Sequence, residues 1–212
     1  MAHLVGERAF RRLRLRVSAD VLVPRPETET LVEWALEVAP PGGAALDWGT
    51  GSGAIALALA DERPDLRLTA IDRSPAALAL AASNAAAAGA SVEWIRSDGF
   101  AALGARRFDL VVANPPYLSE ADLAAASPEL RHEPREALLA GPTGLEALAG
   151  IAAEAPAHLT AGGWLIAEVG AGQAAAVRGL WRRAGLVAVA ARDDLAGIAR
   201  AVGGRAPGAG GR

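Results

Sequence analysis

Apolar and polar positions repeat with different periods along the chain. In residues 3–23 they alternate around arginines, which predicts an extended or hairpin segment. Pro24-Arg25-Pro26 ends that segment. The apolar positions that follow have the spacing of one buried helical face: Leu31, Trp34, Ala35 and Val38. A helix is therefore expected from Glu27 to about Val38, with Thr28 as its cap.

From residue 44 onward, short apolar runs alternate with helical patterns. Strands are expected at 44–48, 66–71, 91–95, 108–113, 164–169, 186–191 and 197–202. Helices are expected at 53–61, 75–88 (after an N-cap Ser74), 145–158 and 173–184. Repeated strand–helix units predict an α/β fold, with a doubly wound, seven-stranded and mostly parallel sheet that follows the β-hairpin.

The domain organisation follows from these elements. Residues 1–23 are expected to form a hairpin or linker, 24–203 one domain, and the glycine-rich 204–212 a disordered tail. The connection at 118–142 is polar and carries prolines, and connections of such length are often functional.

Composition and charge narrow the class of protein. The 212 residues are 52% hydrophobic and 21% charged, a soluble globular balance with enough chain for a full core. No apolar run is long enough for a membrane span and no secretion signal is visible, so a cytoplasmic protein is expected. The chain has no cysteine, and His3, His132 and His158 are scattered, so no metal site is expected. The net charge of −3 argues against a nucleic-acid partner but leaves room for a local arginine patch.

A glycine-rich loop, LDWGTGSG at 46–53, follows the first strand of the sheet. Glycines let a backbone approach a ligand closely, and the helix behind them offers free N–H groups. The candidate contacts are Gly49, Thr50, Gly51, Ser52 and Gly53. Asp72 ends the next strand, where doubly wound folds place an acid on ribose hydroxyls. The ligand is expected to be a nucleoside, although a purely structural turn is the alternative.

Two further acids bear on the identity of that ligand. The loop also fits a dinucleotide pattern, but Asp47 would repel a pyrophosphate. It would not repel a ligand with an amino group and a sulfonium, so it favours S-adenosylmethionine over NAD. Asp98 follows the third strand and is placed to accept from an adenine amino group, with a solvated turn residue as the alternative.

The segment Asn114-Pro115-Pro116-Tyr117 follows the buried strand 108–113, at the strand end where α/β sheets bind ligands. The prolines fix φ and remove backbone donors. The Asn114 side-chain oxygen and the Pro115 carbonyl therefore become rigid acceptors beside the Tyr117 ring. Two such acceptors suit a planar –NH2 group, whose delocalised lone pair needs orientation toward an electrophilic methyl more than it needs a strong base. Direct methyl transfer is expected, with a proline turn that caps the strand as the alternative.

Taken together, these motifs resemble class I methyltransferases of the [N/D]PP[Y/F/W] group that use S-adenosylmethionine. More closely they resemble the HemK/PrmC type, the peptide chain release factor glutamine methyltransferases. The resemblance spans HLVGERAF at 3–10, VLVPRPETE at 21–29, LDWGTGSGAIALALA at 46–60, NPPY at 114–117, HEPREALLAGPTGLEAL at 132–148 and DLAGIAR at 194–200. It implies a Rossmann-like class I methyltransferase fold.

The resemblance also implies a substrate and residue roles. The substrate would be the glutamine of the Gly-Gly-Gln motif in release factors. Asn114 and the Pro115 carbonyl would hold its amide, with Pro116 and Tyr117 beside them. The cofactor would contact the glycine loop, Asp72 and Asn114, and its adenine would lie near Asp98, Gly99 and Phe100. The residues expected at the mouth of the site are Arg25, Thr28 and Glu29, although Arg25 alone could equally be a surface cation that locks the hairpin.

The chain departs from that family in two places. Its members usually begin with a small helical domain, whereas this sequence starts at the hairpin, so a weaker hold on the release factor is expected. Gly99 stands where the family often has an aromatic residue that packs on adenine, and Phe100 is the candidate replacement.

Other functions share parts of this pattern. An amino methyltransferase acting on DNA or RNA uses the same four-residue loop, and a related enzyme methylates glutamine in a ribosomal protein. An NAD-dependent oxidoreductase and a non-catalytic remnant that binds the cofactor are alternatives from other classes. The oligomeric state is left open.

Overall fold

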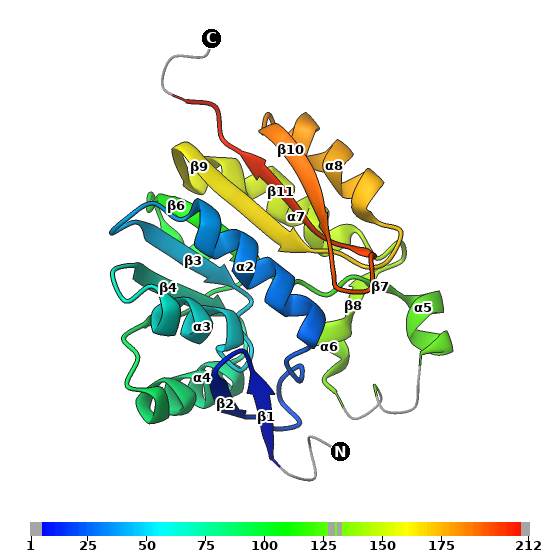
Figure 1. The fold of residues 1–212 in the computed structure, drawn as a ribbon. Helices are drawn as coiled ribbons and strands as arrows, with labels where there is room; N and C mark the ends of the chain where they lie inside the picture. Colours follow the sequence, from blue (N-terminus) through cyan, green and yellow to red (C-terminus); the bar gives the residue numbers. More distant parts are fainter. Residues whose placement is uncertain (1–5, 127–129, 131–132, 209–212) are drawn as a thin grey trace.

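A seven-stranded sheet forms the centre of the computed structural model, which describes residues 6–126, 130 and 133–208 (Figure 1). In spatial order its strands are β10 (Val187–Asp193), β11 (Ala199–Arg205), β9 (Leu159–Glu168), β6 (Phe108–Ala113), β3 (Ala44–Trp48), β4 (Arg67–Asp72) and β5 (Glu93–Arg96). β11 is antiparallel to both of its neighbours, and the other pairs are parallel. The predicted fold class is confirmed. His3 and His132 lie outside the described residues.

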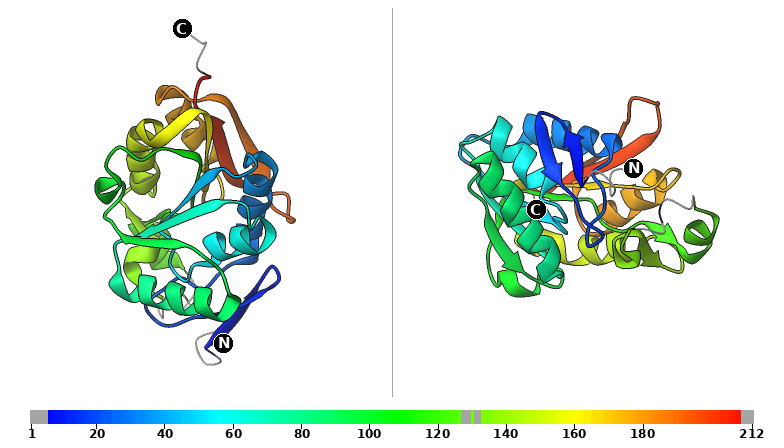
Figure 2. Two further views of the ribbon diagram at one scale, coloured as in Figure 1. Left: turned by 90° about the vertical axis from the view of Figure 1, so that its left-hand side faces the viewer. Right: turned by 90° about the horizontal axis from the view of Figure 1, so that it is seen from below.

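Helices cover both faces of the sheet, as Figure 2 shows. On one face lie α2 (Glu29–Val38), α3 (Ala54–Glu62) and α4 (Pro75–Ala88), and on the other α7 (Glu146–Glu154) and α8 (Ala174–Arg183). Each face has its own core, because alternate strand residues point to opposite sides. Leu110 and Val112 pack toward α2 and α3, whereas Val111 packs toward α7 and α8. No helix in the described part of the chain has the length and apolarity of a membrane span.

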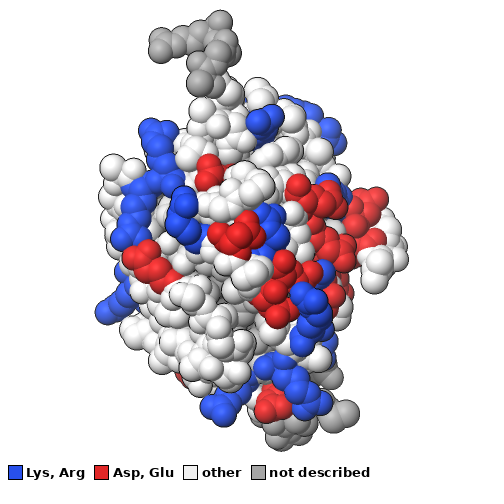
Figure 3. Space-filling view, turned by 60° about the vertical axis from the view of Figure 1, so that its left-hand side comes forward, with Lys and Arg blue, Asp and Glu red and all other residues white. Residues whose placement is uncertain are grey.

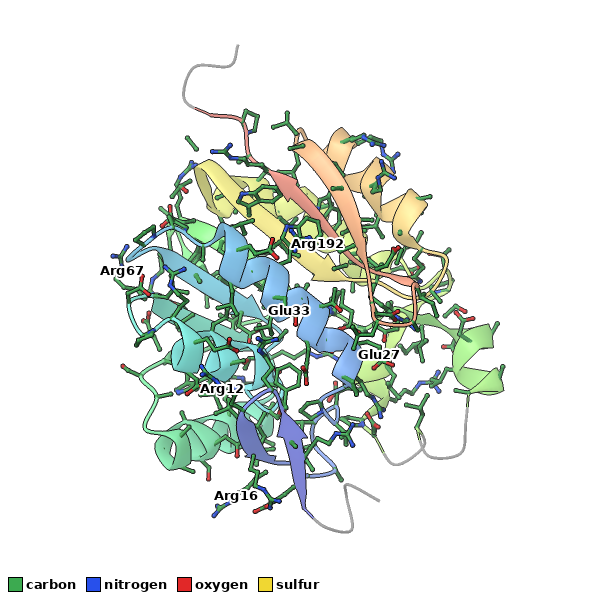
Figure 4. All side chains as sticks on the ribbon, in the orientation of Figure 1. Arg12, Arg16, Glu27, Glu33, Arg67 and Arg192 are labelled. Carbon is green, nitrogen blue, oxygen red and sulfur yellow. The ribbon has the colours of Figure 1, made fainter. Side chains whose placement is uncertain are left out.

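The predicted N-terminal hairpin is present as β1 (Glu7–Phe10) and β2 (Leu13–Arg16). A two-stranded hairpin is only marginally stable alone and needs packing partners. Asn84 of α4 supplies one, since its Oδ1 accepts from Arg16 N at 2.9 Å and its Nδ2 donates to Arg16 O at 3.1 Å. Figure 4 shows Arg12 and Arg16 on this hairpin, and Arg12 pairs with Asp61 of α3.

The long connection after β6 contains short elements of its own. These are β7 (Leu118–Ser119), α5 (Glu120–Ala125), α6 (Arg135–Leu138) and β8 (Leu139–Gly141). Ser119 and Asp122 form a reciprocal capping box at the start of α5. β7 and β8 pair with each other, so the connection returns to the end of β6.

Several expected bounds differ from the structure, and two differences bear on the site and the sheet. Thr28 is the last residue of the 3-10 turn η1 (Pro26–Thr28) and directly precedes α2, but its side chain makes no cap bond and donates instead to Glu168 at 2.6 Å. Gly204 and Arg205, placed in a disordered tail from composition, belong to β11 and pair with β9. Gly203 leaves room for the Trp34 ring of α2, and Gly204 leaves room for the Trp181 ring of α8.

The carboxyl ends of the parallel strands are in register. Trp48 at the end of β3 pairs with Ile71 of β4 and with Ala113 of β6, and Ala113 pairs with Ala167 of β9. The residues just beyond these positions therefore lie in one row across the edge of the sheet: Gly49, Asp72, Asn114 and Glu168. β4 and β6 leave β3 on opposite sides, which makes this edge the switch point where open α/β sheets bind ligands.

The contact between α2 and β11 gives the first testable prediction. A Cβ added at Gly203 would lie 2.7 Å from Trp34 Cη2. Trp34 is 3% exposed, with the Arg192 guanidinium 4.5 Å above its ring, so it cannot withdraw freely. We expect Gly203→Ala to lower the free energy of unfolding by about 1–3 kcal/mol, as overpacking does, measured by urea denaturation.

Gly150→Ala is the matched control. Gly150 is exposed in α7, and a Cβ there would meet nothing within 4 Å. Alanine is a better helix former than glycine, so this change should raise stability by up to about 1 kcal/mol. Equal effects of the two changes would contradict the steric explanation for Gly203.

Candidate active site

The loop between β3 and α3 forms the floor of the site. Gly49, Gly51 and Gly53 have φ angles of 71°, 55° and 85°, which favour glycine. A Cβ at Gly49 or Gly51 would meet nothing within 4 Å, so the backbone there faces open space. Gly49 N and Thr50 N both donate to Ile71 O at 2.9 Å, which fixes the loop against the end of β4.

Asp47 lies behind this loop and not in the cavity. Its Oδ2 accepts from Thr50 Oγ1 at 2.6 Å and from Ala56 N at 3.1 Å, so it ties the loop to the first turn of α3. Its Oδ1 has no hydrogen-bond partner among the described residues. Burial raises the pKa of Asp47 to about 6. Its role is therefore to hold the loop, whereas the sequence suggested a direct effect on the ligand.

Asp72 is held at the cavity wall by backbone donors. Its Oδ2 accepts from Gly51 N and its Oδ1 from Ser74 N, both at 2.9 Å. A carboxylate oxygen has two lone pairs, so each can still accept a hydrogen bond from a ligand hydroxyl. The glycine loop and the predicted ribose acid thus form one rigid unit.

A cavity of about 390 Å³ opens above this unit. The predicted residues in its wall are Gly49, Thr50, Gly51, Ser52, Asp72, Asp98, Gly99, Asn114 and Pro116, together with Thr28. Among the described residues, the wall carries five acids, Asp20, Asp72, Asp98, Glu136 and Glu146, against one cation, Arg73. That excess of negative charge suits a cationic ligand and disfavours a pyrophosphate, which is the preference that the sequence had assigned to Asp47.

Phe100 is not part of the cavity wall, and neither is Gly53. Phe100 is 3% exposed in the core, where its ring stacks on His158 at 4.9 Å. Trp48 lines the cavity instead, 6.5 Å from Phe100, and its buried Nε1 has no partner among the described residues. Phe100 thus packs behind Trp48, whose ring forms the aromatic part of the cavity wall.

The Asn114–Tyr117 loop separates two cavities. Asn114 and Pro116 line the first, whereas Pro115 and Tyr117 line a second of about 340 Å³. The Asn114 Nδ2 donates to Thr28 Oγ1 at 3.2 Å, and the buried Oδ1 has no partner in the described structure. The loop can therefore contact one molecule on each side, with a free acceptor on Asn114.

The residues predicted at the mouth of the site are placed apart. Arg25 lines the second cavity and pairs with Glu133, which joins the start of α2 to the connection before α6. Thr28 lines the first cavity. Glu29 lines neither cavity, and its Oε1 accepts from Arg11 N in the hairpin turn at 3.1 Å.

Sequence reasoning missed several residues of the site. The segment 134–147 supplies part of the first cavity wall, and residues 20–24 supply another part. Glu168 ends β9, is 2% exposed and lines the second cavity; burial raises its pKa to about 7. An acid after the apolar run WLIA was the available signal. Within the described residues, no group of His, Asp and Glu could hold a metal ion.

The surface shows no continuous basic region on the face in Figure 3, where acidic side chains interrupt the arginines. Nucleic-acid binding usually needs such a region for the phosphates. This face therefore lacks that feature of a nucleic-acid-binding surface.

Comparisons with known proteins agree with this geometry. A family model described as methyltransferase small domain matches residues 27–141. The chain is 49% identical over 211 residues to the release factor glutamine methyltransferase of Xylella fastidiosa strain Temecula1, covering 98% of this chain and 77% of that protein. It is 50% identical over 212 residues to the protein of the same name from Cereibacter sphaeroides, covering 99% and 75%.

A solved structure is also similar. The protein-(glutamine-N5) methyltransferase (release factor-specific) of Alicyclobacillus acidocaldarius superposes with a TM-score of 0.55 at 30% identity, covering 87% of this chain and 94% of that chain. The similarity therefore extends over most of both chains.

The buried Asp47 carboxyl gives a prediction on stability. A raised pKa means that the folded chain holds the proton more tightly, so this stabilisation is full below about pH 4 and is lost as pH rises through about 6. Asp47→Asn does not titrate. From pH 4 to pH 7 its free energy of unfolding should therefore rise relative to that of the original chain, by about 2 kcal/mol.

Urea denaturation at several pH values measures this difference. A gap between the two proteins that stays constant with pH would show that Asp47 is ionised at little cost in the folded chain.

Proposed function

Because the chain belongs to the family of release factor glutamine methyltransferases, we propose that it methylates a release factor with S-adenosylmethionine as the donor. The acceptor is the side-chain amide nitrogen of the glutamine in the Gly-Gly-Gln motif. We assign the activity to the domain from residue 24 onward, extended to Arg205 by β11. The protein would act in the cytoplasm, where translation takes place.

The first cavity fits S-adenosylmethionine. Its volume is within the roughly 300–1,000 Å³ of ligand pockets, and its wall is acidic while the ligand carries a sulfonium. Gly49 and Gly51 leave the space of a Cβ empty for the ligand, and Asp72 offers acceptors to the ribose hydroxyls. When bound there, the cofactor supplies an electrophilic methyl group.

The observation that carries the proposal is the division of the two cavities by the Asn114–Tyr117 loop. A methyl donor in the first cavity and a side chain entering through the second would meet at Asn114. The free Oδ1 of Asn114 and the Pro115 carbonyl accept the two amide hydrogens, which orients the nitrogen lone pair toward the methyl group. The amide nitrogen held in this way would accept the methyl group that a bound cofactor would supply, and its proton would leave to water.

Transfer of tritiated methyl from S-adenosylmethionine tests the function. A release factor, its Gly-Gly-Gln variant with Gln→Ala, a ribosomal protein and duplex DNA are offered in parallel. Label is expected on the release factor alone and should vanish in the Gln→Ala variant. Label on DNA or on the ribosomal protein instead would overturn the proposed substrate.

Asn114→Ala should lower the rate of methyl transfer without weakening cofactor binding. The change removes the free Oδ1 acceptor, so we expect kcat to fall by about 10²-fold or more, as for other orienting polar contacts. The Kd of S-adenosylmethionine, measured by calorimetry, should stay within about twofold, because the cofactor's other contacts remain. An unchanged kcat would remove Asn114 from the mechanism.

A further inference from the structure

A chain of hydrogen bonds joins Asn114 and Thr28, in the wall of the first cavity, to Glu168 and Tyr117, in the wall of the second. Asn114 Nδ2 donates to Thr28 Oγ1 at 3.2 Å, and Thr28 Oγ1 donates to Glu168 Oε2 at 2.6 Å. Tyr117 OH donates to the other Glu168 oxygen at 3.3 Å. Thr28 is 3% exposed and Glu168 2%, so water does not compete with these bonds. The chain joins the start of α2, the end of β9 and the loop after β6.

The direction of this chain depends on one hydrogen atom. A hydroxyl has a single hydrogen, and Thr28 gives it to the carboxylate of Glu168. Thr28 can then only accept from Asn114, which must turn its –NH2 group toward Thr28 and its oxygen away from it. The two ends of a carboxamide have nearly the same shape, so hydrogen-bond partners decide which end faces the ligand.

We propose that Glu168 is a positioning residue that acts through Thr28 to keep the Asn114 side-chain oxygen facing the substrate amide. The inference rests on the proposed function, because it assigns Asn114 the task of accepting from that amide. Without an acceptor at position 168, the Thr28 hydroxyl is free to donate to Asn114. The carboxamide would then turn over and present a donor to the amide hydrogens, which would repel them.

The charge on Glu168 matters to this direction. A carboxylate only accepts hydrogen bonds. A protonated Glu168 can instead donate to Thr28, which reverses the direction of the hydrogen bonds from Glu168 to Asn114. The charged and titratable groups around it are Arg200 of β11, Glu27 and Arg25 before α2, and Tyr117. Figure 4 shows Glu27 at the N-terminal end of α2. Burial raises the pKa of Glu168 to about 7 although Thr28, Tyr117 and Arg200 favour the ionised form.

Two substitutions at Glu168 test the proposal. Glu168→Leu removes the acceptor in a side chain of similar size, and we expect kcat to fall about 10-fold or more, with the Kd of S-adenosylmethionine within about twofold. Glu168→Gln keeps the size of the side chain but cannot ionise, and like a protonated Glu168 it can donate to Thr28. It should therefore lower kcat at pH 8 and remove the decline of kcat below about pH 7 that is expected in the original protein.

Substitutions at Thr28 test the same chain of hydrogen bonds, because Thr28 is its middle member. Thr28→Val removes the hydroxyl with little change in shape and should lower kcat as Glu168→Leu does, whereas Thr28→Ser should restore it. The double change Thr28→Val with Glu168→Leu should cost no more than either change alone, because both break one chain. Thr160→Val is the control, since Thr160 makes a similar bond to Asp109 at 2.8 Å, outside both cavities.

The outcomes distinguish a failure of the proposed function from a failure of the role proposed for Glu168. A wild-type chain that transfers no methyl to the release factor overturns the proposed function, and this inference with it. An active wild type whose Glu168→Leu and Thr28→Val variants keep full kcat overturns the inference alone. So does an acid decline that persists in Glu168→Gln. If Glu168→Leu does not fold, the Thr28→Val and Thr28→Ser pair decides by the same comparison.

Discussion

The parallel pairing of β3 with β4 on one side and β6 on the other is the constraint on which the site depends. Because parallel strands end at the same edge, this register places Gly49, Asp72 and Asn114 in one row, and the pairing of β6 with β9 adds Glu168. None of these residues is near another in sequence. Burial of Leu46, Leu110 and Val111 maintains the register, so the geometry of the site is a consequence of core packing.

The elements that sequence reasoning placed best are those with strong local signals. The bounds of β3, α4 and β6 agree with the expectation, since local signals mark them: Gly49 follows β3, Ser74 and Gly89 flank α4, and Asn114-Pro115 follows β6. Composition misled at Gly204, where glycine was taken as a sign of disorder. There it leaves room beside Trp181, which packs over β11. Prediction from a local sequence pattern therefore fails where packing against a side chain distant in sequence decides the conformation.

Some residues of the candidate site could likewise be predicted from local sequence, and others could not. Gly49, Asp72 and Asn114 were predictable, because each follows a buried strand and has the chemistry that its place requires. Phe100 was expected at the ligand but packs in the core behind Trp48, after a turn in which Ser97 Oγ donates to Gly99 O and Gly99 has a φ of 57°. The bond of Thr28 to Glu168 spans 140 residues, and no local pattern carries that information.

Two buried acids show how stability and function oppose each other here. Burial raises the pKa of both Asp47 and Glu168, so each is less stable ionised in the folded chain than in water. Neither is required by the core, where an apolar residue would avoid that cost. Each instead accepts from a threonine hydroxyl, and that threonine lies in the wall of the first cavity. Ionised acids set the direction of these bonds, and polar groups at the ligand are thereby held in one orientation before the ligand arrives.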